Sequence, residues 1–233
     1  MKESSIRTAM LLGESAVHQL GNKHVAVFGI GGVGGFCAEA LARAGVGALT
    51  LVDDDTVSVS NLNRQLVALR STIGMVKTDV MAARIADINP DCRVTVMTMR
   101  YTEQDKDRFF ETGFDYVADC IDSVACKTSL IETAIHLQIP IISAMGTGNK
   151  LDPTKFVITD LSKTSGCPLA RVMRRELKQR NILHHTVLYS TEPALKPSFQ
   201  PDEGKNVPGS VAWVPSCAGL MMAGHIIQQL IHE

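Results

Sequence analysis

Four polar residues of this chain could act together on a phosphate. Asn61 and Arg64 lie in "LVDDDTVSVSNLNRQ", Lys77 follows, and Asp122 lies in "DCIDS". One amide and two cations within a short span suit an α-phosphate under attack, where negative charge builds up in the transition state. A carboxylate opposite them suits Mg²⁺ bridging phosphates, because magnesium prefers oxygen ligands. This set predicts ATP-dependent adenylyl transfer, and hydride transfer has no evident use for it.

A glycine-rich turn precedes these residues. The stretch "VAVFGIGGVGGFC" places Gly29, Gly31 and Gly34 in a G-x-G-x-x-G pattern, with Gly32 beside the second of them. Backbone amides in such a turn, together with the N-terminus of the helix that follows, can receive phosphate. Asp53 comes about 20 residues later and is placed to accept hydrogen bonds from a ribose hydroxyl. The pattern predicts adenine-nucleotide binding; a turn that only packs a helix on a strand is the structural alternative.

Strand and helix patterns alternate along the first 150 residues, and these elements must position the polar residues. We expect strands at 23–30, 48–53, 93–99, 115–121 and 139–144, and helices at 4–20, 33–45, 76–88 and 124–137. Such alternation predicts an α/β fold with a Rossmann-like, doubly wound, mostly parallel sheet and helices on both faces. Ligands bind at the carboxyl edge of such a sheet, where the glycine turn and "DCIDS" would meet.

The character of the sequence changes after Gly148. We expect a strand at 155–161, a basic helix from Leu169, a Pro-rich loop at 193–208, a strand in "GSVAWVP" and an apolar helix at 216–231. This part is short, so we expect it to extend the same sheet within one domain over residues 1–233. Residues 1–150 would form the nucleotide-binding core, and residues 151–233 would bind substrate and form dimer contacts.

Composition describes an ordinary soluble protein, with 45% hydrophobic and 20% charged residues. We expect no membrane partner, because no uninterrupted apolar run approaches the ~20 residues of a membrane helix. The N-terminus "MKESSIRTAM" has no apolar signal core. The six cysteines include no CxxC pair and fit a reducing compartment. We therefore expect a cytoplasmic protein.

These motifs together, "GIGGVG", "LVDDDTVSVSNLNRQ", Lys77 and "DCIDS", resemble the adenylating superfamily of ThiF, MoeB and the ubiquitin-activating enzymes. In that superfamily a carboxylate attacks the α-phosphate of ATP, giving an acyl-adenylate and pyrophosphate. The resemblance implies ATP and Mg²⁺ as cofactors, with Asp53 on the ribose and Asp55 beside the phosphates. It makes Asp122 the magnesium ligand.

The same resemblance assigns further roles. Asn61, Arg64 and Lys77 would contact the phosphates and the transition state. Arg7, in "SSIRTAMLLGE", matches the arginine that reaches the ATP of the partner subunit in this superfamily. A homodimer with Arg7 acting in trans is therefore implied.

The second part of the chain is similar to one branch of the superfamily. The stretches "AMGTGNKLDPTKFVITDLSKTSGCPLARVMRRELKQR" and "PGSVAWVPSCAGLMMAG" resemble the tRNA threonylcarbamoyladenosine dehydratases. Members of that branch adenylate the carboxylate of a threonylcarbamoyl group on an adenosine beside the anticodon. A nitrogen or oxygen of the same group then displaces AMP and closes a five-membered ring. The resemblance implies tRNA as substrate, and whether a cysteine desulfurase or another sulfur-relay protein is a partner stays open.

A cationic strip supports a nucleic-acid substrate. On a helix from Leu169, one face carries the apolar residues Leu169, Val172, Met173 and Leu177. The other carries Arg171, Arg174, Arg175 and Lys178. Such a strip suits contacts to a phosphate backbone, although a basic run is also common on a solvated face. We expect it to bind tRNA.

Two other function classes stay open. The first is an adenylyltransferase that activates the C-terminus of a ubiquitin-like sulfur-carrier protein; such enzymes commonly carry the CxxC pairs that are absent here. The second is a non-catalytic nucleotide-binding scaffold or a dehydrogenase, against which Arg64, Lys77 and Asp122 argue. A catalytic thiol at Cys167, a metal or base at His184 and His185, and a base-stacking Trp213 are weaker interpretations. We expect Trp213 to lie in the core.

Overall fold

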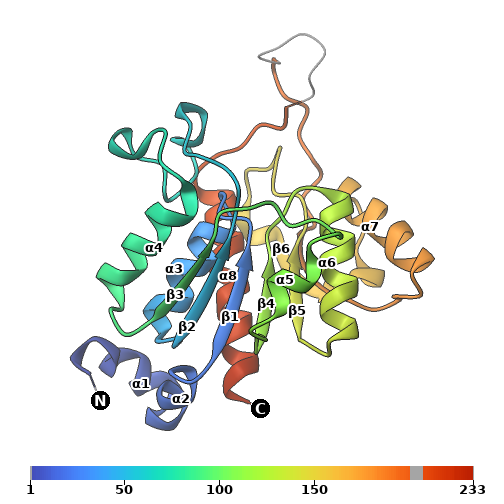
Figure 1. The fold of residues 1–233 in the computed structure, drawn as a ribbon. Coiled ribbons are helices and arrows are strands. Elements are labelled where there is room, and N and C mark those ends of the chain that lie inside the picture. The colour runs from blue at the N-terminus through green and yellow to red at the C-terminus, as the bar shows by residue number, and fades with distance from the viewer. Residues whose placement is uncertain (1, 200–206, 233) are drawn as a thin grey trace.

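The computed structural model describes residues 2–199 and 207–232, and its sheet has the strand order β3-β2-β1-β4-β5-β7-β6 (Figure 1). The strands are β1 (His24–Phe28), β2 (Ala48–Val52), β3 (Arg93–Met97), β4 (Tyr116–Asp119), β5 (Ile141–Ala144), β6 (Phe156–Asp160) and β7 (Thr186–Ser190). All neighbours pair in parallel except β6, which runs antiparallel to β7. The expected doubly wound, mostly parallel sheet is confirmed, and β6 and β7 extend it.

Helices cover both faces of the sheet (Figure 1). One face carries α3 (Gly34–Ala44), α4 (Lys77–Ile88) and α8 (Trp213–Ile231). The other carries α5 (Lys106–Phe110), α6 (Val124–His136) and α7 (Pro168–Gln179). Two short helices, α1 (Ile6–Leu12) and α2 (Glu14–Leu20), precede β1. The structure also has the short 3-10 helices η1 (Glu3–Ser5), η2 (Val59–Asn61), η3 (Arg70–Thr72), η4 (Pro153–Lys155) and η5 (Leu161–Lys163).

The inner strands are apolar on both faces because helices cover both. The segments "VAVF" of β1 and "ALTLV" of β2 are buried at every position. Continuous apolar runs of this kind are typical of parallel strands inside an α/β sheet. Helix α3 begins directly after the glycine turn and ends at Gly45, whose φ of 95° gives the left-handed conformation common after a helix. The turn between β1 and α3 is thereby fixed at the carboxyl edge.

Two of the expected elements differ from the structure. The helix expected at 4–20 is broken into α1 and α2 at Gly13, whose φ is 90°. The strand expected in "GSVAWVP" is wrong, because α8 already begins at Trp213. Val214 and Ala218 are both buried, at helical spacing, against the core under the sheet. Pro215 is tolerated in the first turn of this helix, where its missing N–H has no intrahelical partner to lose.

Helix α8 is 19 residues long and apolar enough to cross a membrane by length and composition alone. The sequence predicts a shorter apolar helix here, at 216–231, and no apolar run of membrane-spanning length. Its buried residues pack against α3 and the sheet, so it serves here as a core helix. Of the Pro-rich loop expected at 193–208, residues 200–206 lie outside the described part of the chain.

Candidate active site

A cavity of about 740 Å³ opens at the carboxyl edge of the parallel strands. Segments that follow β1, β2, β4 and β5 line it, as expected for a fold of this class. The residues proposed from the sequence that line it are Gly29, Gly31, Gly32, Asp53, Asp55, Asn61, Arg64, Lys77 and Asp122. The fold thus brings together three separate stretches of sequence around one cavity.

The glycines of the turn have different roles. Gly29 has a φ of 88°, and a Cβ there would lie 2.8 Å from the carbonyl oxygen of Cys120. A Cβ on Gly34 would lie 1.8 Å from the carbonyl oxygen of Gly29, so only glycine fits. Gly31 is different: the nearest heavy atom to its Cβ position is Nε2 of Gln65, at 3.9 Å. Gly29 and Gly34 therefore serve close packing, and Gly31 leaves room for a ligand. Gly34, proposed as a nucleotide contact, does not line the cavity.

Asp53 ties the end of β2 to the glycine turn. Its Oδ2 accepts a hydrogen bond from the backbone N–H of Ile30 at 2.5 Å, and its Oδ1 accepts one from the N–H of Asp55 at 2.8 Å. Burial raises the pKa of this carboxyl, and these hydrogen bonds and the charge of Lys77 oppose that rise. Two backbone amides fix the orientation of the carboxylate at the cavity wall, where a nucleotide ribose would lie.

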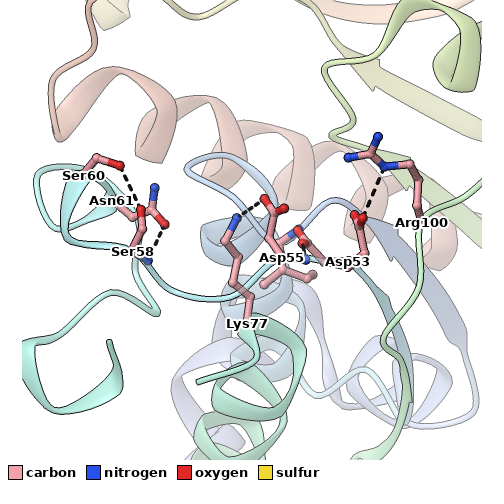
Figure 2. A network of polar contacts seen from close by, with 9 residues as sticks. Asp53, Asp55, Ser58, Ser60, Asn61, Lys77 and Arg100 are labelled. Atoms are coloured by element: carbon pink, nitrogen blue, oxygen red, sulfur yellow. Dashed lines mark hydrogen bonds and ion pairs between the residues drawn. The ribbon is translucent and has the colours of Figure 1, made fainter. Parts of the chain in front are cut away.

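Lys77 and Asp55 form an ion pair at the cavity. Lys77 is the first residue of α4, and its Nζ lies 2.7 Å from Oδ2 of Asp55 (Figure 2). An isolated antiparallel bridge joins Thr56 to Val76 and holds the two segments side by side. Only 4% of Lys77 is exposed, so its ammonium is shielded from bulk water. A cation held this way is suited to negative charge that develops on a bound phosphate.

Asn61 and Arg64 are carried by the turn around η2. The Oδ1 atom of Asn61 accepts a hydrogen bond from the backbone N–H of Ser58 at 3.0 Å (Figure 2). Arg64 donates from Nη1 to the carbonyl oxygen of Ser60, at 2.9 Å. Its Cγ lies 3.7 Å from the Cβ position of Gly32. The turn therefore lays the guanidinium-bearing side chain against the glycine turn.

Acidic residues also line the cavity. Asp122 lies exposed in the turn between β4 and α6. Carboxylate oxygens of Asp53, Asp54 and Asp55 lie within 4.8 Å of one another. These ligand atoms are all oxygens, which is the donor set that Mg²⁺ prefers. The residues present thus fit a magnesium ion bound together with nucleotide phosphates.

Arg7 lies away from this cavity. It is exposed on α1, which precedes β1 at the amino ends of the strands (Figure 1). The side chains three and four residues further along α1, Met10 and Leu11, are 78% and 88% exposed. Arg7 thus shares a helix face with two apolar side chains that the rest of the chain leaves uncovered.

The basic helix starts at the cavity, since Leu169 in the first turn of α7 lines it. Met173 and Leu177 are buried as expected. Arg171, Arg175 and Lys178 are exposed, and Arg175 lies 2.8 Å from Glu176. Arg174 is half-buried and donates to the carbonyl oxygen of Thr164 at 2.9 Å. Three of the four cations therefore face solvent, and Arg174 holds the loop before α7.

Sequence reasoning missed two charged groups near the cavity. Lys127 on α6 is completely buried, and its Nζ lies 2.7 Å from Oδ2 of Asp119. A lysine inside the apolar helical run "VACKTSLIETAI" was a usable signal. Arg100 lines the cavity, and its Nε lies 3.3 Å from Oδ2 of Asp54.

The structure also places Cys167, His185 and Trp213, for which the sequence offered weaker functional interpretations. Cys167 is 3% exposed and does not line the cavity. His185 is buried beside Ser143, with Nε2 and Oγ 2.8 Å apart, and burial lowers the pKa of this imidazole to about 3. Trp213 is 51% exposed, so the expectation of a core position is wrong, and its Nε1 donates to the carbonyl oxygen of Leu151 at 2.8 Å.

Comparison with known proteins adds to this geometry. The model of the ThiF family matches residues 4–233. The chain is 44% identical over 239 residues to the tRNA threonylcarbamoyladenosine dehydratase of Bacillus subtilis, covering 97% of this chain and 94% of that protein. The structure of the Escherichia coli tRNA N6-threonylcarbamoyladenosine dehydratase in complex with AMP has a TM-score of 0.90 at 39% identity, covering 97% of this chain and 93% of that one. The same enzyme in complex with ATP has a TM-score of 0.89 at 38% identity, with the same coverage.

Proposed function

Because this chain belongs to the ThiF family, we propose that it is an ATP-dependent enzyme that dehydrates threonylcarbamoyladenosine in tRNA. The observation that carries the proposal is the cavity at Gly31, which Arg64, Lys77 and Asp122 line together. A relative that matches along nearly its whole length bears the name of this dehydratase, and the similar Escherichia coli structures hold AMP and ATP.

The reaction has two steps that balance. An oxygen of the threonyl carboxylate attacks the α-phosphorus of ATP, and the bond from that phosphorus to the bridging oxygen breaks, which releases pyrophosphate. A nitrogen or oxygen of the same threonylcarbamoyl group then attacks the activated carbonyl carbon, loses its proton and expels AMP. One carboxylate oxygen leaves with AMP, so the base loses the elements of water.

Different residues of the cavity would contact the phosphates, the ribose and the transition state. The open face of Gly31 and the N-terminus of α3 would receive the phosphates. Asp53, fixed by two backbone amides, would hold the ribose, with Asp55 beside the phosphates. Asn61, Arg64 and Lys77 would stabilise the charge that develops at the α-phosphorus, which is a transition-state contact.

Magnesium binding is a finer proposal for the same cavity. Asp122 would hold the ion, and the oxygen-rich wall around Asp53 and Asp54 fits it. A bound Mg²⁺ would neutralise phosphate charge and orient the leaving pyrophosphate.

Binding of tRNA would use the exposed cations of α7. Arg171, Arg175 and Lys178 face solvent from a helix whose first turn lines the cavity, so phosphates of the anticodon stem could lie along it. Arg174 would contribute indirectly, by fixing the loop that ends at Thr164.

The active form would be a homodimer. Arg7 lies too far along the amino edge of its own sheet to line its own cavity, and the exposed side chains of Met10 and Leu11 give its helix face an apolar surface to bury. A second copy in a closed, two-fold arrangement would cover this face and bring Arg7 to the ATP of the partner. There it would neutralise charge on the departing pyrophosphate.

We also propose roles for the two parts of the chain, a cellular compartment and a partner protein. Residues 1–150 would form the nucleotide-binding core, and residues 151–233 the part that binds substrate and forms dimer contacts. The protein would act in the cytoplasm, where tRNA is modified. A cysteine desulfurase or sulfur-relay partner stays a prediction, which co-purification with such a protein would test.

Nucleoside mass analysis tests the function. Incubation of tRNA that carries threonylcarbamoyladenosine with enzyme and ATP should convert that nucleoside to one lighter by one water, with AMP as co-product. The alternative, activation of a ubiquitin-like sulfur carrier, is less supported, and ATP–pyrophosphate exchange that requires such a carrier would reveal it. A dehydrogenase or inert scaffold would release no AMP.

A further inference from the structure

A fully buried ion pair lies behind the wall of the cavity that carries Asp122. Nζ of Lys127, on α6, lies 2.7 Å from Oδ2 of Asp119, at the end of β4, and both side chains are 0% exposed. The pair lies between the sheet and α6, on the face that is otherwise apolar core.

Stability alone does not explain such a pair. Removing two charges from water costs free energy that their mutual attraction repays only in part, and apolar residues of similar volume often stabilise a core as well or better. Lys127 also lies close enough to His185 to lower the pKa of that imidazole, in addition to the effect of burial. His185 is therefore neutral and hydrogen-bonded to Ser143, so it is not a second counterion for Lys127.

The pair is connected to the turn that carries Asp122. The second carboxylate oxygen of Asp119, Oδ1, accepts a hydrogen bond from the backbone N–H of Ile121 at 3.1 Å. At the other end of the turn, the backbone N–H of Lys127 donates to the carbonyl oxygen of Ser123 at 2.9 Å. Asp122 lies between these two attachment points and is itself exposed at the cavity. Its place therefore depends on the backbone of the turn.

The geometry orients Asp119 in a defined way. The ammonium of Lys127 engages one carboxylate oxygen, which leaves the other pointing at the N–H of Ile121. Because both side chains are fully buried, their ion pair is shielded from bulk water. The chain of contacts runs from Lys127 through Asp119 to Ile121, one residue before the acid proposed to act on phosphate-bound Mg²⁺.

We propose that Lys127 and Asp119 are positioning residues, which fix the Ile121–Asp122 backbone so that the Asp122 carboxylate is placed for its proposed role of holding Mg²⁺ at the nucleotide phosphates. The inference rests on the proposed adenylation function. It assigns the acceptor that Asp119 offers to the N–H of Ile121 to the chemical step, with Lys127 orienting that carboxylate, since misplacement of a reacting group by about 1 Å can cost about a hundredfold in rate.

Two matched double variants test this. Asp119→Asn with Lys127→Met removes both charges but keeps a side-chain carbonyl that can accept from the N–H of Ile121. Asp119→Leu with Lys127→Met removes both charges and the acceptor in nearly the same volume. Thermal unfolding, ATP affinity, turnover on tRNA and amide hydrogen exchange at Ile121 would be measured for both and for the unmodified protein.

We expect both double variants to fold and to bind ATP within about threefold of the unmodified protein. The contacts that bind the ground state and the transition state equally are kept in both. The asparagine variant should keep turnover within about tenfold, whereas the leucine variant should lose about a hundredfold. The amide of Ile121 should exchange about fivefold faster, or more, only in the leucine variant, as expected for the loss of one hydrogen bond.

Three results would overturn the proposal. Equal turnover in the two double variants would show that the acceptor for Ile121 does not matter to the chemistry. Unchanged exchange at Ile121 in the leucine variant would remove the link to the turn. A leucine variant that fails to fold would make the contact a requirement of the fold instead. Failure of the proposed function itself would be distinguishable, because the unmodified protein would then not dehydrate tRNA.

Discussion

The Nζ atom of Lys77 lies 2.7 Å from Oδ2 of Asp55, with the lysine side chain 5% exposed and the aspartate side chain 60% exposed. The asymmetry means that the two partners are not equivalent. Without Lys77, the carboxylate of Asp55 is solvated by water; without Asp55, a buried ammonium loses its anionic neighbour, which costs more. Lys77 can therefore be replaced with little effect on the fold.

A Lys77→Met variant separates charge from packing, because methionine keeps most of the apolar stem. We expect turnover to fall by about 10²–10³-fold, since a contact to charge that develops in the transition state is lost. The free energy of unfolding should change by less than about 1 kcal/mol, because the remaining carboxylate is exposed. Lys155→Met, at an exposed position away from the cavity, is the control and should be neutral. Equal activity of the two variants would remove Lys77 from the chemistry.

Asp122→Asn tests the magnesium proposal. Nucleotide affinity should stay near that of the unmodified protein while turnover falls by about 10³-fold or more, because the contact counts mainly in the transition state. The matched control is Asp107→Asn, an exposed acid on α5 that does not line the cavity, and its effect should be much smaller. Near-normal turnover of Asp122→Asn at limiting magnesium would exclude Asp122 from the mechanism.

The exposed strip on α7 is tested by replacing Arg171, Arg175 and Lys178 together with alanine. Binding of tRNA should weaken, and the slope of log affinity against log salt should become shallower by about 2–3, because fewer counterions are released. Affinity for ATP should hardly change. Arg174→Ala should behave differently and lower the melting temperature, since it breaks the contact to Thr164. An unaltered salt slope in the triple variant would leave the strip as a solvated surface.

The role of Arg7 in trans is tested by mixing inactive homodimers. Arg7→Ala and Asp122→Ala should each be nearly inactive alone. Re-association should give dimers in which one site carries both changes and the other carries neither. Activity should then recover towards about a quarter of that of the unmodified protein, because about half of the dimers are mixed and each has one intact site. If a mixture is shown to contain heterodimers and still stays inactive, Arg7 acts within its own chain or has no part in the reaction.

Buried His185 makes the free energy of unfolding depend on pH below neutrality. Burial lowers its folded pKa from 6.5 to about 3, so the unfolded chain binds a proton more readily between these values. Its contribution to stability is complete above pH 6.5 and is lost as the pH falls towards 3. His185→Gln should therefore reduce the loss of stability between pH 7 and pH 4 by at most about 3 kcal/mol. Denaturant unfolding at both pH values checks this, and an identical loss in both proteins would contradict it.

The sequence predicted the sheet and most of the cavity because both depend on local signals. Buried parallel strands have continuous apolar runs in the sequence. The glycine turn directly follows β1, and the segment "SNLNRQ" lies in the single connection between β2 and α4. The start of α8 was missed, because the alternation in "GSVAWVP" resembles a strand while Val214 and Ala218 face the core at helical spacing. The contact between Arg174 and Thr164 was also out of reach, since it depends on how a loop folds back on its helix.

The pair of Lys127 and Asp119 lay between these cases. Asp119 is the first residue of "DCIDS", and a lysine within an apolar helix is visible in the sequence. Whether such a lysine reaches solvent or a buried acid depends on how α6 packs on β4, which only the structure gives. The same holds for Arg7, whose distance from its own cavity follows from the position of α1 beside the sheet.

The central claim, that this site activates a carboxylate on tRNA by adenylation, is tested most directly by an oxygen label. Substrate tRNA would carry a heavy oxygen isotope in the threonyl carboxylate, and the AMP released on dehydration would be examined by mass spectrometry. Attack of that carboxylate on the α-phosphorus places a labelled oxygen in the phosphate of AMP. The account predicts labelled AMP, formed in step with the dehydrated nucleoside and lost in Asp122→Asn. Dehydration accompanied by unlabelled AMP, or by ADP and phosphate, would contradict it.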